Sequence, residues 1–86
     1  MYIPVTVNGP TLVIGAGASA ARGEWIVFHI TNRGATRVKI SFDGHTSAQI
    51  APHARGVLAL LVIRRGLFPL VLTTGGRRVT RPFVVY

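Results

Sequence analysis

The sequence predicts an all-β protein, an antiparallel sandwich or barrel of about seven or eight short strands. Three observations support this prediction. Apolar residues recur at every second position, turns rich in glycine, proline and asparagine separate the apolar runs, and hardly any segment has helical periodicity. A chain of 86 residues has room for one domain with one core, so residues 1–86 are expected to form a single domain.

The first half of the chain contains four candidate strands. Residues 3–7 and 11–14 supply one or two strands at the start. In residues 24–31 an apolar set alternates with a second set, which is strand periodicity, and residues 36–42 alternate between a dry face and a wet face. The turn signal Asn32-Arg33-Gly34 separates these last two strands.

The second half begins with the run VLALLVI at residues 57–63. Because both of its faces are apolar, it is predicted to be a central strand. Residues 67–73 follow, and Pro69 indicates an edge or a bulge because proline lacks a backbone donor. Residues 74–77, TGGR, predict a hairpin into a terminal strand at residues 78–86, with Val79, Phe83 and Val85 on one side.

Residues 11–20, TLVIGAGASA, place an apolar run before G-x-G-x-x-A, the spelling of a dinucleotide-binding turn. That turn functions at the start of a crossover helix, whose first amides hold the pyrophosphate. Here only residues 18–22 could be helical before Gly23, and strand periodicity resumes at Glu24, so the chain is too short at this point for a crossover helix. No cofactor is therefore expected, and residues 15–23 are predicted to form a flexible loop of small residues.

Charge is the strongest compositional signal. Ten basic residues face two acidic ones, Glu24 and Asp43, which gives a formal charge of +8. Such an excess favours polyanionic partners, chiefly nucleic acid or an anionic surface. The alternative is a basic surface that only keeps the protein soluble.

The location of the protein is only weakly indicated. The longest apolar run has seven residues, far fewer than the ~20 of a membrane-spanning helix. The start of the chain lacks the features of a secretory signal. We expect a cytoplasmic protein if the chain is complete, and no location is indicated if it is a piece of a longer protein.

Catalytic chemistry is not expected. Two acidic residues leave little for a pair of carboxylates, and the histidines and serines show no recognised catalytic spacing. The residues concerned are His29, His45, His53, Ser19, Ser41 and Ser47. The chain is therefore predicted to be non-enzymatic.

A metal site has two weak candidates, His45 and His53. They flank the loop GHTSAQIAPH and could approach each other. Two imidazoles without a carboxylate or thiolate would make at most an open, weak site. Surface histidines without a metal are the preferred interpretation.

Residues 22–86 resemble the cupredoxins, the Greek-key sandwiches of the blue copper proteins. The family pattern has a glycine before a V-x-F strand, then N-x-G, an H-x-F strand and a P-G turn before an apolar strand. The corresponding segments are RGEWIVFHITNRG, TRVKISF, IAPHARGVLALLV, RRGLFPLVL and RPFVVY. The resemblance implies a cupredoxin-like fold, but Val38 occupies the position of the first copper-binding histidine. The loop that should hold the other ligands reads TTGGRR, so no type 1 copper is expected.

If the topology matches the resemblance, the turn at 32–37 and the hairpin at 75–78 share one end of the sandwich. Arg33, Arg37, Arg77 and Arg78 would form a basic cluster there, and Lys39 and Arg81 would extend it into a stripe. Arg64 and Arg65 would lie at the opposite end.

The first functional hypothesis is a binding module that holds polyanions, with nucleic acid phosphates as the leading candidate. The four phenylalanines are expected in the core, so contact with phosphate is expected without base readout. Only Tyr2, Trp25 and Tyr86 remain as surface aromatic candidates.

The second hypothesis is an assembly subunit of a coat, filament or complex, or a homo-oligomer, that uses apolar strand edges at residues 3–7 and 84–86. A weak copper-binding or zinc-binding relative of the cupredoxins ranks third.

Overall fold

The structure is a computed structural model that describes residues 1–15 and 19–86. It contains nine strands: β1 (Tyr2–Asn8), β2 (Thr11–Ile14), β3 (Ser19–Ala20), β4 (Trp25–Asn32), β5 (Val38–Phe42), β6 (His45–Thr46), β7 (Arg55–Leu61), β8 (Gly66–Thr74) and β9 (Arg77–Val85). The all-β prediction is confirmed. No helix of the described residues is long and apolar enough to cross a membrane.

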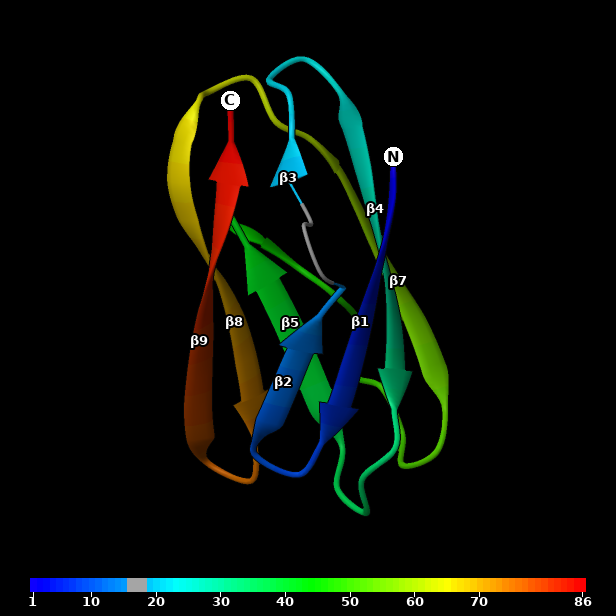
Figure 1. Ribbon diagram of the computed structural model, residues 1–86. Helices are drawn as coiled ribbons and strands as arrows, with labels where there is room; N and C mark the ends of the chain where they lie inside the picture. Colours follow the sequence, from blue (N-terminus) through cyan, green and yellow to red (C-terminus); the bar gives the residue numbers. More distant parts are fainter. Residues whose placement is uncertain (16–18) are drawn as a thin grey trace.

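Two sheets form the sandwich (Figure 1). One has the strand order β2-β1-β4-β7 and the other the order β3-β9-β8-β5-β6. The alternating residues of both sheets fill the space between them, as the periodicity of residues 24–31 and 36–42 predicted. Phe28, Phe42 and Phe83 meet at the centre, with ring centroids 5.3 to 5.5 Å apart.

The prediction of a purely antiparallel fold is partly wrong. β1 runs parallel to β4, from Tyr2 opposite Val27 to Val7 opposite Asn32, and β3 runs parallel to β9. The remaining strand pairs are antiparallel. Alternation of apolar residues has the same form in both arrangements, because side chains alternate between faces whichever way the neighbouring strand runs.

The prediction that residues 57–63 form a central strand is wrong. β7 is the edge strand of its sheet. Leu58 and Leu60 point into the core, whereas Val57 is 54% exposed and Leu61 is 41% exposed on the outer face. The run is apolar on both sides because this outer face of the sheet is itself apolar.

The two segments expected to be strand edges are not edges. β1 lies inside its sheet, with β2 on one side and β4 on the other. Val84 and Val85 pair with β8 on one side and with β3 on the other. At Pro69 the expected edge is present, because the pairing of β8 with β5 stops at Leu70 and, among the described residues, Pro69 pairs only with Pro82 of β9.

The prediction of a loop at residues 15–23 is only partly correct. Ser19 and Ala20 form β3, which completes one sheet beside β9. Residues 16–18, which are half of the six-residue G-x-G-x-x-A motif, lie outside the described residues. The hairpin predicted at residues 74–77 is confirmed: Thr74 pairs with Arg77, and Gly75 and Gly76 both have positive φ, as a tight two-residue turn requires.

Candidate polyanion-binding end

Four connections meet at the lower end of the sandwich in Figure 1, which we call the basic end. They are the hairpin between β1 and β2, the loop at residues 33–37 between β4 and β5, the segment that leads into β7, and the hairpin between β8 and β9. The basic end therefore gathers residues from the beginning, the middle and the end of the chain.

Hydrogen bonds join these connections. The Thr74 hydroxyl donates to the carbonyl oxygen of Arg37 at 3.3 Å and lies 2.9 Å from the hydroxyl of Thr36. The amide of Arg33 donates to the carbonyl of Val7 at 2.7 Å. The loop at residues 33–37 is thus tied to β8 on one side and to β1 on the other.

Asn32 anchors the same loop from inside. Its side chain is fully buried. Its amide nitrogen lies 2.8 Å from the carbonyl of Thr36, 3.2 Å from that of Ile50 and 3.1 Å from that of Ala51, and its side-chain oxygen accepts from the amide of Gly34 at 3.0 Å. The sequence marked this residue only as part of a turn signal, whereas the structure makes it the internal support of the basic end.

The structure places four of the six predicted cations directly at this end. Arg33 and Arg37 lie in the loop between β4 and β5, and Arg77 and Arg78 begin β9. All four are exposed. Lys39 lies on the outer face of β5, in one cross-strand row with Thr73 and Arg78, so it continues the group along that face.

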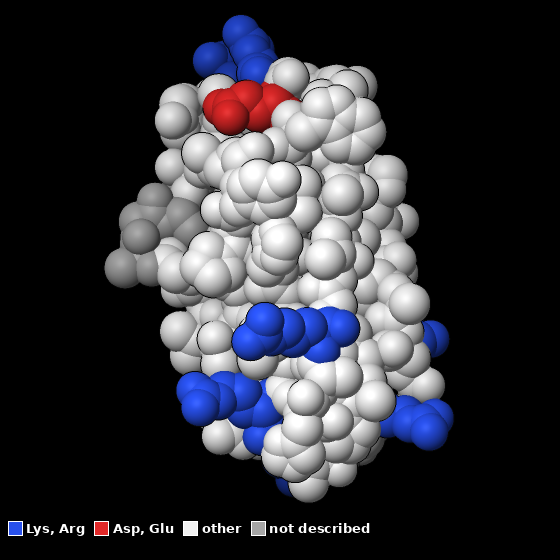
Figure 2. Space-filling view, turned by 90° about the vertical axis from the view of Figure 1, so that its right-hand side faces the viewer, with Lys and Arg blue, Asp and Glu red and all other residues white. Residues whose placement is uncertain are grey.

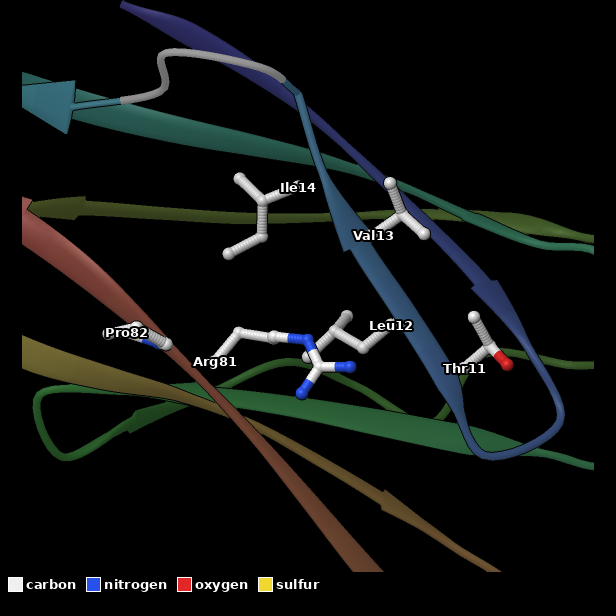
Figure 3. Close-up of a pocket in the computed structure, with 6 residues that line it drawn as sticks. All are labelled: Thr11, Leu12, Val13, Ile14, Arg81 and Pro82. Carbon is white, nitrogen blue, oxygen red and sulfur yellow. The ribbon is translucent and has the colours of Figure 1, made fainter.

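Arg81 does not extend this stripe as predicted. It pairs with Leu70, whose side chain is buried, so it lies on the inner face of β9, opposite to Arg78. Figure 3 shows its side chain reaching from β9 toward β2, into an open groove of about 470 Å³. The sequence could have revealed this orientation. Arg81 is two residues from both Val79 and Phe83, and residues two apart on a strand point to the same face.

Arg55 belongs to the basic end but is not among the residues predicted from the sequence. It begins β7 opposite Thr31, one residue before the end of β4. Its place depends on the pairing of β4 with β7, which local sequence patterns do not reveal. Six cations therefore lie at or next to the basic end: Arg33, Arg37, Lys39, Arg55, Arg77 and Arg78.

Both carboxylates of the chain lie at the opposite end. Glu24 precedes β4, and Asp43 follows β5 and accepts a hydrogen bond from Arg64 at 2.8 Å. Figure 2 shows one side of the molecule, with most of its basic side chains in the lower part, an acidic side chain beside a further basic group at the top, and an uncharged zone between them. Among the described residues, the basic end therefore has cations without a neutralising partner.

The surface aromatic residues also lie away from the basic end. Tyr2, Trp25 and Tyr86 are 74%, 61% and 64% exposed. Trp25 accepts a hydrogen bond from the amino terminus, and Tyr86 pairs with residues near β3, which places all three near the two chain termini at the top of Figure 1. Stacking of bases between cations and aromatic rings is thus not available at the basic end in the described part of the chain.

A shallow hollow of about 220 Å³ opens at the basic end. It is lined by Gly9, Pro10, Thr36, Thr74, Gly75 and Arg77. One arginine, two hydroxyls and the backbone of two glycine turns therefore border a single small depression. Guanidinium, hydroxyl and amide groups are the usual partners of phosphate oxygens.

The two histidines considered as metal ligands do not approach each other. His45 lies in β6 opposite Phe42, where β5 ends, whereas His53 precedes β7 near the level where β5 begins. They are separated by roughly the length of β5. Residues 1–15 and 19–86 contain no group of three or more histidine, cysteine or acidic side chains arranged to hold a metal ion.

No known protein family and no curated protein matches the sequence. Solved structures do match its fold. Lac15 from a marine microbial metagenome aligns with a TM-score of 0.66 at 12% identity, over 99% of this chain and 32% of its own. Fet3p, a multicopper oxidase that functions in iron import, aligns with a TM-score of 0.54 at 9% identity, over 98% of this chain and 27% of its own.

The fold is therefore that of a cupredoxin-like β-sandwich, as the sequence resemblance implied. The chain spans a third or less of the length of either structure. The residues at the copper positions do not fit a blue copper ion. Val38 is buried at the start of β5, the chain has no cysteine, and the loop after β8 is a tight diglycine turn.

Proposed function

We propose that this chain is a non-enzymatic binding module that holds a polyanion at its basic end, with nucleic acid phosphates as the first ligand to test. The observation that carries the proposal is the separation of charge. Six cations lie at or next to one end, and both carboxylates lie at the other. Like charges held together without internal ion pairs repel one another, and a bound polyanion relieves that repulsion.

The residue types favour phosphate as the group that is bound. Five of the six cations are arginines, whose planar guanidinium groups contact phosphate with two hydrogen bonds. Gly75 and Gly76 carry no side chains that would keep a ligand from the backbone between Thr74 and Arg77. The hollow beside Arg77 offers a place for one phosphate group.

The same geometry argues against reading of base sequence. In the described residues the basic end is built from turns and strand ends, without a helix that could enter a major groove. The exposed aromatic rings lie at the other end. Binding is therefore expected to depend on phosphate spacing and salt and to be nearly independent of sequence.

The test is fluorescence anisotropy of a labelled oligonucleotide over a series of salt concentrations. An Arg77→Ala, Arg78→Ala double variant removes two charges from the basic end, and an Arg22→Ala, Arg65→Ala double variant removes two from elsewhere. If each arginine contacts one phosphate of duplex DNA, the first variant flattens the slope of log K against log salt by about 1.8. The control variant keeps the parent slope.

Two results would count against the proposal. If the parent shows no binding at low salt, the excess charge serves solubility only. If the two double variants weaken binding equally, the affinity reflects net charge and not the basic end. If the parent does bind through the basic end, competition with inorganic polyphosphate distinguishes a general polyanion site from one that needs a nucleic acid backbone.

The assembly function is a second candidate, although the strand edges first considered for it are paired. What favours it in the structure is a different surface, the exposed outer face of the sheet β2-β1-β4-β7, on which large apolar residues are concentrated.

A further inference from the structure

The outer face of β1, β4 and β7 is an apolar surface. The strand registers arrange its residues in rows: Trp25 beside Leu61; Tyr2, Val27 and Ala59 in the next row; Pro4, His29 and Val57 in the third; and Thr6, Thr31 and Arg55 in the last. We call the first three rows the apolar face. Its residues belong to the described part of the chain, and none of them is an arginine, a lysine or a carboxylate.

The outer face of the other sheet is different. Its central rows contain Lys39, Thr73 and Arg78, followed by Ser41, Val71 and Thr80. This is the ordinary composition of a solvated sheet face. Farther along this face Pro69 pairs with Pro82 and Leu67 with Val84, and Leu67 and Val84 are 67% and 47% exposed. The outer face of this sheet is therefore mixed, with charged and polar rows beside two apolar ones, whereas the face of β1, β4 and β7 is apolar over three consecutive rows.

We propose that the apolar face binds the apolar face of a second copy of this chain, in a two-fold dimer that packs sheet against sheet. This inference goes beyond the binding of polyanions and does not depend on it. The occupant is argued from the area available and from the distribution of charge.

The area is sufficient for a small dimer. Tyr2 and Trp25 are 74% and 61% exposed, and Val57 and Leu61 are 54% and 41% exposed. With its smaller members, the face offers about 500 to 600 Å² per copy, so a pair buries about 1,000 to 1,200 Å², which reaches the lower limit for a specific interface. The chain exposes 5130 Å² in total, so each copy would cover roughly a tenth of its surface, as standard interfaces do.

The composition of the apolar face fits the core of an interface. Exposed tryptophan and tyrosine are enriched in such cores, where they supply most of the binding energy. The rings of Tyr2 and His29 already lie 4.9 Å apart, from centroid to centroid, on neighbouring strands. The rings are inclined to each other by 50° and already in contact, so this part of the face needs little ordering when a partner binds.

Charge selects the orientation of the two copies. A net charge of +8 per chain opposes any dimer in which the basic ends coincide. A two-fold axis that crosses the strands, in the plane of the face, places the basic end of each copy beside the end that carries Glu24 in the other. β7 then faces the partner's β7 in the opposite direction, so Arg55 lies over the row of Trp25 and Leu61, where a guanidinium can stack on the indole ring.

The experiment measures molar mass by sedimentation equilibrium over a dilution series from millimolar to micromolar concentration. The parent is expected to pass from twice 9.2 kDa to 9.2 kDa on dilution. Val57→Lys places a charge in the apolar face and is expected to weaken the dimer at least tenfold. Leu67→Lys adds the same charge at a residue that is 67% exposed on β8, in the other sheet, and is expected to dimerise like the parent.

A second measurement tests the orientation. The natural chain has no cysteine, so introduced thiols are unique. In the antiparallel arrangement a mixture of Arg55→Cys and Leu61→Cys chains forms the mixed disulfide under mild oxidation. Self-disulfides of Leu61→Cys, with no mixed product, would overturn the antiparallel arrangement.

Salt separates this proposal from the polyanion site. Added salt screens the repulsion between two cationic chains and strengthens the dimer, whereas it weakens binding to nucleic acid. Val57→Lys should keep the anisotropy response of the parent, and Arg77→Ala, Arg78→Ala should keep its dimerisation. A parent mass of 9.2 kDa at every concentration, or equal loss of mass in Val57→Lys and Leu67→Lys, would overturn the dimer through this face.

Discussion

Replacing Asn32 with alanine should loosen the basic end from within. The side chain of Asn32 joins three segments, because it contacts the carbonyls of Thr36, Ile50 and Ala51 and accepts the amide of Gly34. Alanine cannot make any of these four contacts. The loop that carries Arg33 then loses the support that fixes it between β4 and β5.

The expected cost follows from the number of bonds lost. A hydrogen bond inside a protein contributes about 1 kcal/mol net, and the two hydrogens of the Asn32 amide are shared among three carbonyls, so we count three bonds instead of four. The carbonyl of Ile50 keeps a second partner, the amide of Val38 at 3.0 Å, which limits the loss. We therefore expect Asn32→Ala to lower the free energy of unfolding by about 3 kcal/mol, equivalent to a decrease in Tm of roughly 12 to 24 °C for a domain of this size.

Urea unfolding followed by tryptophan fluorescence measures this change, with Asn8→Ala as the control. Asn8 is exposed at the end of β1, and its substitution should change the free energy by less than about 0.5 kcal/mol. Asn32→Asp keeps the shape but turns a carboxylate oxygen toward carbonyls, so it should lose at least as much as alanine. A loss below about 1 kcal/mol in Asn32→Ala would refute the role assigned to this side chain.

Two further substitutions test the packing of the ends. Gly34→Ala would place a Cβ 2.8 Å from the backbone nitrogen of Gly9, so it should force the loop away from the hairpin between β1 and β2. We expect the free energy of unfolding, measured by thermal unfolding, to fall by about 1 to 3 kcal/mol. Ala35→Ser, at an exposed position in the same loop, should have almost no effect. Arg64→Ala removes an ion pair with Asp43 in which the arginine side chain is 69% exposed, so the unfolding free energy should change by less than about 1 kcal/mol, and a larger loss would show that this pair fixes the end that carries Asp43.

Much of the fold could be predicted from the sequence because core residues repeat at every second position. Ile26, Phe28 and Ile30 point inward as their spacing indicates, and the diglycine turn at residues 75–76 forms where positive φ is required twice. These features depend on neighbours along the chain. For that reason they are visible before any tertiary contact is known.

The arrangement of strands was less accessible. In VLALLVI the residues on both faces of the strand are apolar. Such a run fits a strand covered on both sides as well as an edge strand with an exposed apolar face. The parallel pairing of β1 with β4 likewise leaves no mark in the alternation. Both features depend on which strands lie next to each other, and this is settled by packing between distant segments.

The candidate site combines both kinds of information. The cupredoxin-like resemblance placed the connections after β4 and β8 at one end, which brought Arg33, Arg37, Arg77 and Arg78 together. The alternation of side chains along a strand could have placed Arg81 on the inner face with Val79 and Phe83. The position of Arg55 followed only from the register of β7 against β4.

By itself the sequence determined the all-β class, the positions of most strands and the excess of positive charge, because composition and local periodicity depend only on neighbouring residues. Tertiary structure alone decided the parallel pairs, the edge position of β7, the support from Asn32 and the place of Arg55 beside the other cations of the basic end. It also decided that Tyr2, Trp25 and Val57 share one exposed face. Each of these depends on contacts between residues far apart in the chain, which are selected by the packing of the whole domain.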